Sequence, residues 1–122
     1  MKYMLLCYDD VEFWARAGDD ALQEAMQEAV RLTHELHAKG QYLMAAPLQS
    51  PSRGASVRVR NGRRLVTDGP FAEAREVVGG FYVIDVDDLD QAIEIAARHP
   101  GARAGTVEVR PLIELEGLPG AK

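Results

Sequence analysis

The chain has little cysteine and no long apolar run. Cys7 is the one cysteine among 122 residues, so an internal disulfide is excluded and the reducing cytoplasm is the expected compartment. No stretch reaches the roughly 18 apolar residues that a membrane-spanning helix needs. The apolar run at the start ends at Asp9-Asp10 and is too short for a secretory signal. A cytoplasmic protein without a membrane partner is therefore predicted.

Basic residues are outnumbered by acidic ones, 14 to 19, and the formal net charge is −5. A chain with this balance is not expected to bind nucleic acid, whose phosphates attract basic surfaces. Residues 53–64 contain no acid and five arginines, which are Arg53, Arg58, Arg60, Arg63 and Arg64. Two interpretations stay open: the charges discourage edge-to-edge strand pairing, or they form a local patch that binds anions.

Candidate metal ligands are scarce. His34 and His37 lie three residues apart on one predicted helix, a spacing that can place two ligands on one metal. No cluster of Cys or His completes such a site, and we expect neither a metal nor a cofactor. His37 by itself could act as an acid or base in a pocket, although packing between helix and sheet explains it equally well.

The hydrophobic pattern predicts a four-stranded sheet. Residues 2–8 and 81–86 are apolar on both parities, which is typical of strands in the middle of a sheet. Residues 42–47 and 106–110 are predicted as the other strands. The last of these alternates polar and apolar residues and runs into a proline, as edge strands do.

Two helices are predicted from apolar stripes with a period of 3.6 residues. The first begins near Asp19 or Asp20, where Asp20 and Gln23 resemble a capping box, and it stops at Gly40. Its apolar arc comprises Leu22, Ala25, Met26, Ala29, Val30, Leu32, Leu36 and His37. The second is capped by Asp88, and its expected buried stripe comprises Leu89, Ala92, Ile93, Ala96 and Ala97. Residues 9–18, before the first helix, are predicted as a loop or a short irregular turn.

The strongest local signal is Asn61-Gly62 between two β-favouring runs, residues 56–60 and 63–67. Both turn residues tolerate positive φ, so a type I′ hairpin is predicted. The Asp-Gly-Pro-Phe sequence at 68–71 then ends the second strand. Without this inserted hairpin, the order of elements is the split βαβ, or ferredoxin-like, arrangement, in which the first and third core strands are central.

The two predicted helices leave one face of the predicted sheet uncovered. Two helices cover only one face, whereas the central strands are apolar on both. An uncovered apolar face on the order of several hundred Å² is rare on a monomer. The economical solution is a second sheet from an identical chain, packed face to face, and a homodimer is therefore predicted. Residues 1–122 are expected to form a single domain, with a core over about 1–113 and a tail over 114–122.

Several segments, in order, carry a resemblance to a known family. They are Asp68-Gly-Pro-Phe-Ala-Glu73, Gly79-Gly-Phe-Tyr82, Asp85-Val-Asp-Asp-Leu89 and Val107-Glu-Val-Arg-Pro111. The chain resembles the DGPF-domain branch of the YCII-related proteins over essentially its whole length. The resemblance implies ferredoxin-like domains that dimerise into an α+β barrel. It also implies a genomic association with extracytoplasmic-function sigma factors.

The better-understood YCII branch is thought to use a His–Asp pair at its first helix. In this chain the matching positions hold Glu28 and Ala38. Neither member of the pair is present, so that chemistry is not carried over.

Asp68 is the most informative candidate for a functional residue. An Asp before Gly-Pro caps its own turn, which explains it structurally. The functional interpretation is that the end of the strand gathers two acids, a base and an aromatic ring at one cavity mouth. On that interpretation Asp68 and His37 are candidate acid–base residues, and the candidate ligand-binding residues are Phe71, Glu73, Arg75, Glu76 and Trp14. Trp14 either covers a cavity or simply packs, and Cys7 is expected to be a buried, inert thiol.

Three functions remain open at this point. The first is a dimeric module that binds a small molecule and is linked to sigma-factor signalling. The second is a small enzyme that uses Asp68 or His37 as acid or base on a small, anionic substrate. The third is a structural partner protein without a ligand. The missing His–Asp pair favours the first.

Overall fold

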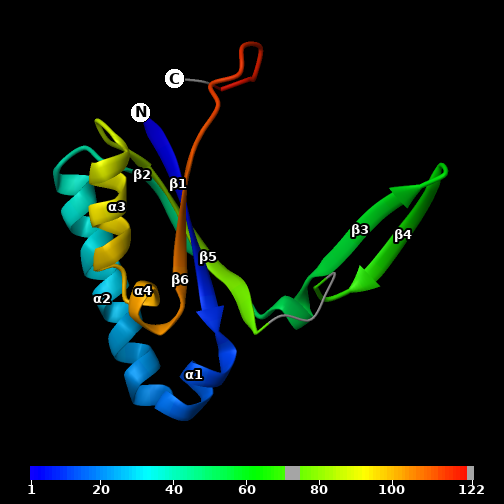
Figure 1. Cartoon of the computed structure of the whole chain (residues 1–122), viewed down its shortest axis with the longest axis horizontal. Helices are drawn as coiled ribbons and strands as arrows, with labels where there is room; N and C mark the ends of the chain where they lie inside the picture. Colours follow the sequence, from blue (N-terminus) through cyan, green and yellow to red (C-terminus); the bar gives the residue numbers. More distant parts are fainter. Residues whose placement is uncertain (71–74, 121–122) are drawn as a thin grey trace.

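The computed structural model describes residues 1–70 and 75–120 (Figure 1). The chain is α+β, with antiparallel strands and helices. The sheet strands are β1 (Lys2–Asp10), β2 (Tyr42–Pro47), β5 (Glu76–Asp85) and β6 (Thr106–Pro111), and the hairpin is formed by β3 (Ala55–Arg60) and β4 (Arg63–Asp68). The helices are α1 (Val11–Ala17), α2 (Asp19–Ala38), α3 (Leu89–Arg98) and α4 (Gly101–Ala104), and a 3₁₀ turn spans Pro51–Arg53.

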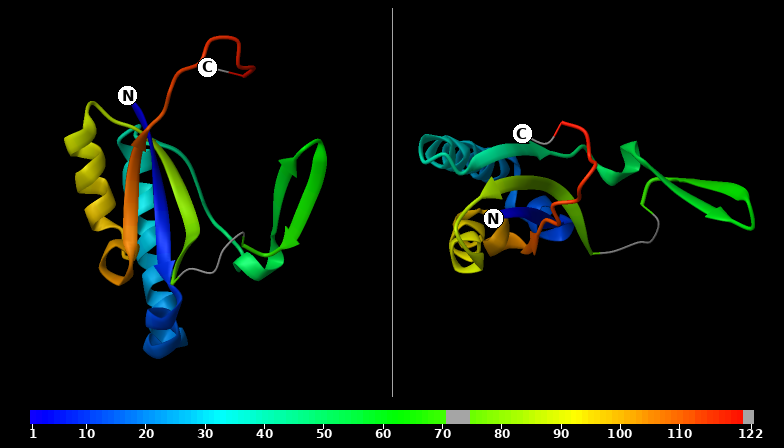
Figure 2. Two further views of the ribbon diagram at one scale, coloured as in Figure 1. Left: turned by 45° about the vertical axis from the view of Figure 1, so that its right-hand side comes forward. Right: turned by 90° about the horizontal axis from the view of Figure 1, so that it is seen from above.

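The main sheet has the strand order β2-β5-β1-β6, and each neighbouring pair is antiparallel. The prediction that the first and third core strands are central is confirmed, and so is the edge position of the last strand. Helices α2 and α3 lie on one side of this sheet, and the β3–β4 hairpin projects away on the other side (Figure 2).

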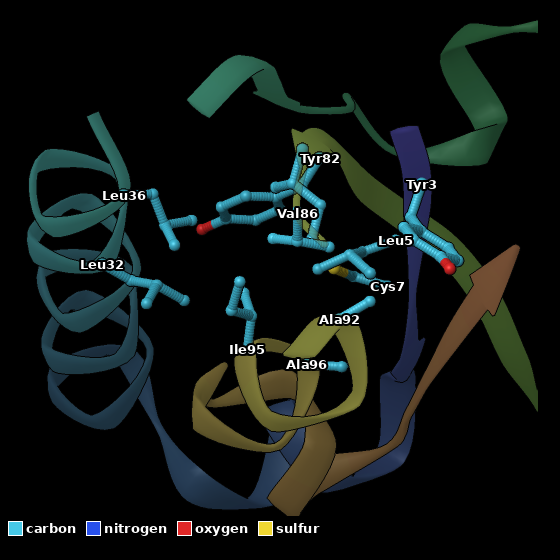
Figure 3. Close-up of a cluster of buried hydrophobic side chains, with 11 residues drawn as sticks. Tyr3, Leu5, Cys7, Leu32, Leu36, Tyr82, Val86, Ala92, Ile95 and Ala96 are labelled. Carbon is cyan, nitrogen blue, oxygen red and sulfur yellow. The ribbon is translucent and has the colours of Figure 1, made fainter. Parts of the chain in front are cut away.

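The core lies between the sheet and the two long helices (Figure 3). Alternate residues of the central strands point into it, because successive side chains of a strand face opposite ways. The buried side chains are Tyr3, Leu5, Cys7, Leu32, Leu36, Tyr82, Ile84, Val86, Ala92, Ile95 and Ala96. Burial of each large apolar side chain stabilises the fold by about 1.5–3 kcal/mol.

The opposite face of the sheet is apolar and only partly shielded. Met4 and Leu6 of β1 alternate with the buried residues and pair with Val83 and Phe81 of β5. Met44 of β2 extends this surface and is 53% exposed. The central strands are thus apolar on both faces, as predicted. In the described part of the chain no helix covers this second face (Figure 2).

The segment at residues 9–18 was predicted as a loop or a short irregular turn, and this is wrong because residues Val11–Ala17 form α1. Asp10 is the N-cap, and its carboxylate accepts hydrogen bonds from the backbone N–H groups of Glu12 and Phe13 at 3.1 and 3.2 Å. These bonds satisfy donors that a helix start otherwise leaves unpaired. The expected capping box of α2 is also wrong, since α2 begins at Asp19 and Gly18 occupies the N-cap position without a side-chain bond.

The strand predicted at residues 81–86 begins earlier, because β5 already starts at Glu76 and contains both glycines. Gly80 lies against β2, where an added Cβ would be 3.1 Å from the Ala46 carbonyl oxygen. The double glycine is therefore part of the strand rather than a turn before it. A close backbone approach explains why this position has no side chain.

The second long helix begins as predicted. The Asp88 carboxylate accepts a hydrogen bond from the Gln91 N–H at 2.9 Å. Its buried stripe differs from the prediction, because Leu89 and Ile93 are about half exposed and Ala97 is exposed, whereas Ile95 is buried. The buried side of α3 is therefore rotated relative to the predicted stripe, and the helix packs against β6. The short helix α4 was not predicted.

The hairpin is confirmed at its turn and at its end. Asn61 has φ 54° and Gly62 has φ 74°, as a type I′ turn requires. Strand β4 ends at Asp68, before Gly69 with φ 80°. Across residues 1–70 and 75–120, none of the helices is both long and apolar enough to cross a bilayer.

Candidate functional site

A cavity of about 530 Å³ lies between α2 and the β2–β5 side of the sheet. Its walls are mostly apolar, and four side chains that line it are partly exposed, namely Leu22 (39%), Met26 (51%), Val30 (55%) and Leu48 (49%). This volume falls within the range of small-molecule sites, which are apolar clefts with a few polar groups. The first residues of α2's predicted apolar arc therefore face a cavity rather than the core.

Asp9 brings a carboxylate to this cavity. The pairing of β1 with β5 shifts between Cys7 and Tyr8, which leaves Gly79 as an extra residue opposite them. Such bulges often redirect side chains next to functional sites. A Cβ at Gly79 would collide with the Asp9 carboxylate, so the missing side chain there is what admits the acid.

The Asp9 carboxyl is partly buried, and burial raises its pKa above the usual value. The indole N–H of Trp14 favours the ionised form and opposes this rise. Trp14 also lines the cavity and packs edge-to-face against Phe13, with ring centroids 5.1 Å apart. Trp14, which was predicted to bind a ligand, thus lines the same cavity as Asp9.

His99 supplies a second polar group in the cavity wall. Its Nδ1 accepts a hydrogen bond from the Gly101 N–H at 2.9 Å, so in the neutral ring the proton is on Nε2. Nε2 lies 4.0 Å from the Cys7 sulfur, and the ring packs edge-to-face on Tyr82. Burial lowers the pKa of His99, and the ring therefore acts as a neutral hydrogen-bond donor.

Burial disfavours the ionised, nucleophilic forms of Cys7 and Tyr82. Burial raises the pKa of the Cys7 thiol to about 12 and that of the Tyr82 phenol to about 12. The Tyr82 hydroxyl donates a hydrogen bond to the Ala29 carbonyl at 3.2 Å and ties β5 to α2. The expectation that Cys7 is a buried, inert thiol is confirmed.

The cavity is acidic rather than basic. Among the described residues that line it, Asp9 is the one Asp or Glu, and no Lys or Arg contributes. A carboxylate beside apolar and aromatic walls attracts cations and hydrogen-bond donors and repels anions. The position that matches the family's helix histidine, Glu28, is engaged elsewhere, in an ion pair with Arg103 at 2.7 Å.

The other predicted site residues lie away from this cavity. His37 is exposed near the end of α2, with its ring 6.2 Å from that of Tyr42, so the expected packing into the apolar arc is wrong. Asp68 is exposed at the end of β4, where it pairs with Ala55 at the base of the hairpin. Phe71 and Glu73 lie outside the described residues.

Two more of these residues mark the start of β5. Arg75 is exposed and pairs with Asp10 at 3.3 Å and with Glu12 at 3.6 Å. Glu76 is exposed and lies opposite Asp10 in the β1–β5 register. The cation of the predicted cluster thus stabilises the N-cap of α1.

Sequence reasoning missed Asp9, Gly79 and His99. The bulge that brings Asp9 over Gly79 comes from pairing between distant strands, which no local pattern reveals.

In residues 1–70 and 75–120, no three His, Cys, Asp or Glu side chains are grouped so that they could hold a metal ion.

Stability should depend on pH through His99. Its pKa is lowered on folding, so the unfolded chain binds the proton more readily, and the free energy of unfolding should fall as pH drops below about 6.5. Urea titrations between about pH 7.5 and pH 5.5 measure this. The variant His99→Gln should flatten the dependence, whereas His34→Gln should retain it. An identical slope in native protein and His99→Gln would contradict the prediction.

Comparison with known proteins identifies the family of this chain. The family model of the YCII-related domain matches residues 1–116. An uncharacterised protein of Rhizobium meliloti (strain 1021) is 32% identical over 114 residues, which cover 92% of each chain. The residues that the family model spans include the strand that carries Asp9, the double glycine of β5 and the helix end at His99. The chain belongs to the YCII-related family.

Proposed function

We propose that this YCII-related protein is a dimeric module that binds a small molecule in the cavity beside Asp9. The observation that carries the proposal is a cavity of about 530 Å³ with apolar walls and a partly buried carboxyl. Apolar pockets with a few convergent polar groups and a titratable residue of shifted pKa are the usual sites of ligands.

The fold supports the dimeric part of the proposal. The strand order β2-β5-β1-β6 with two helices on one face supports our proposal of a ferredoxin-like split βαβ arrangement, with the hairpin as an insertion. The apolar face formed by Met4, Leu6, Phe81 and Val83 is only partly shielded. Packing of two such faces would form a dimeric α+β barrel and remove this surface from water.

The polar groups define the ligand class. Asp9 accepts hydrogen bonds and attracts positive charge when it is ionised, and the His99 Nε2–H donates. Trp14 and Tyr82 provide aromatic surface for an apolar body. The ligand is therefore an apolar or aromatic molecule that carries an amine or another hydrogen-bond donor.

Three naphthalene probes test this ligand class: 1-naphthylmethylamine, 1-naphthylmethanol and 1-naphthoate. They share one apolar body and carry a cationic, a neutral and an anionic head group. Above the raised pKa of Asp9, calorimetric titration should show the amine binding about tenfold tighter than the alcohol, and the carboxylate weakest. The preference for the amine should decline as pH falls through the pKa of Asp9, because protonation removes the charge.

Two variants distinguish the effect of the Asp9 charge from the effect of the cavity shape. Asp9→Asn should remove the preference for the amine and keep binding of the alcohol. Gly79→Ala should weaken both, because the new Cβ displaces the Asp9 side chain into the cavity. His37→Gln is the control, since His37 does not line the cavity. Failure of all three probes to bind, or an unchanged preference in Asp9→Asn, would contradict the proposal.

An enzyme that uses Asp68 or His37 as acid or base is the alternative function. Both side chains are exposed, so a substrate could reach them from solvent. Asp68→Asn and His37→Gln should leave binding of the naphthalene probes unchanged if the cavity is the site. We also place the chain in the DGPF branch on its Asp-Gly-Pro-Phe sequence, and with it propose a cytoplasmic role linked to sigma-factor signalling.

A further inference from the structure

The β3–β4 hairpin has two chemically different faces. The register pairs Val57 with Val66 and Val59 with Arg64. Because successive side chains alternate between faces, one face carries Val57, Val59 and Val66, together with Ala55, Arg64 and Asp68. The other carries Arg60 and its partner Arg63, together with Ser56, Arg58, Leu65 and Thr67. The hairpin thus has one face that is rich in valine, called the valine face, and one that is rich in arginine.

This ribbon has little support within its own chain. Val57, Val59 and Val66 are 61%, 60% and 54% exposed, and the two strands form a sheet of their own. An isolated two-stranded hairpin is at best marginally stable in water, and it gains stability from a third strand or a packed surface. In the described part of the chain, no salt bridge includes Arg60 or Arg63.

The C-terminal tail has the complementary pattern. In the sequence Ile113-Glu-Leu-Glu116 the apolar and acidic residues alternate with a period of two, as in a strand. Ile113 is 87% exposed and Leu115 is 62% exposed. The last backbone bond to the sheet is from the Leu112 N–H to the Lys2 carbonyl, at 2.9 Å. The tail then extends away from the sheet (Figure 1).

The tail and the hairpin lie at opposite ends of β1. The tail leaves beside Tyr3, which pairs with Pro111. The hairpin connects to the start of β5 at Glu76, which pairs with Asp10. At about 3.3 Å per residue these ends are roughly 20–25 Å apart. In a two-fold dimer with packed sheet faces, the tail end of one copy can lie beside the hairpin end of its partner.

We propose that the tail of one copy docks as a third strand on the β3–β4 hairpin of its partner. Ile113 and Leu115 pack on the valine face, and Glu114 and Glu116 face the arginines. Backbone hydrogen bonds to an unpaired hairpin edge supply the affinity, and the alternating side chains set the register. This inference rests on the homodimer of the proposed function. It identifies the acidic tail of the second copy as the partner of the arginine-rich hairpin.

Charge reversal tests the contact. The tail variant is Glu114→Arg with Glu116→Arg, and the hairpin variant is Arg60→Glu with Arg63→Glu. A control with the same net charge as the tail variant is Glu24→Arg with Glu94→Arg, both on exposed helix positions. Sedimentation velocity and native mass spectrometry report the dimer dissociation constant and the subunit composition. Each reversed variant should dissociate about a hundredfold more readily than the native protein, and the control should not.

Mixing identifies which copy supplies the tail. An equimolar mixture of tail and hairpin variants should form heterodimers of nearly native affinity, because each tail then meets a hairpin of opposite charge. A chain that carries all four substitutions should also dimerise normally, which shows that the variants fold. If the four-substitution chain recovers but the mixture does not, the tail docks on its own hairpin and the proposal is overturned.

The remaining outcomes separate this contact from the dimer itself. A native dimer whose dissociation constant is unchanged in both reversed variants overturns the tail contact and leaves the proposed dimer standing. A native chain that sediments at 13.4 kDa at all concentrations overturns both. Probe binding at Asp9 is measured separately and does not depend on either result.

Discussion

Ile84→Ala is expected to lower the free energy of unfolding by about 4 kcal/mol, which is among the largest effects of a single substitution in this chain. Ile84 is 0% exposed and lies in the central strand β5. Its register partners are Tyr3 of β1 and Tyr42 of β2. Removing three side-chain carbons there leaves a cavity that strands paired on both sides cannot fill. Urea titration measures the loss.

Ile93→Ala is the matched control on α3. Ile93 is 49% exposed, and alanine favours a helix, so the change should stay within about 0.5 kcal/mol. Ile84→Val should lie between the two, at about 1 kcal/mol. Comparable losses for Ile84→Ala and Ile93→Ala would show that the core does not lie between the sheet and the helices as described.

Gly105→Ala is the second substitution with a large expected effect, a destabilisation of about 3 kcal/mol or more. Gly105 precedes β6, and a Cβ there would collide with the backbone carbonyl oxygen of Tyr8 and lie 3.3 Å from the Asp10 nitrogen. Backbone atoms of a paired strand cannot move aside as a flexible side chain can. The substitution should therefore disturb the β1–β6 pairing, and thermal unfolding would measure the loss.

Gly54→Ala is the control for Gly105→Ala. A Cβ at Gly54 would meet the Pro51 carbonyl oxygen at 3.5 Å, an ordinary contact. Gly54 has φ −104°, which any residue adopts. This variant should unfold at nearly the native temperature. A Gly105→Ala variant that melts like Gly54→Ala would mean that β6 is free to shift along β1.

Proximity along the sequence was a poor guide to which residues form the candidate site. The cluster predicted around Asp68 rested on proximity along the chain. Arg75 instead pairs with Asp10 and Glu12, and Asp68 lies on a hairpin that projects from the sheet. The acid in the cavity is Asp9, whose neighbours come from α1, α2 and β5. Distant strands and helices form this site.

Trp14 illustrates a partial success. Its sequence surroundings left open whether it covers a cavity or packs. In the structure it does both, because it lines the cavity beside Asp9 and packs on Phe13. What was missed was the helix that holds it. Asp10 is a favourable N-cap residue, and α1 is too short to show an apolar periodicity.

The amino-acid sequence by itself determined the elements whose causes are local. The Asn61-Gly62 turn, the Asp88 cap, the stop at Gly40 and the doubly apolar central strands are all present as predicted. Each depends on backbone preferences or on a repeat within a few residues. Only the tertiary structure decided the bulge opposite Cys7 and Tyr8, the position of Asp9 over Gly79, and the position of the His99 ring beside Cys7. These features arise where segments separated by about 70 residues or more meet, because strand pairing and close packing select them rather than local backbone preferences.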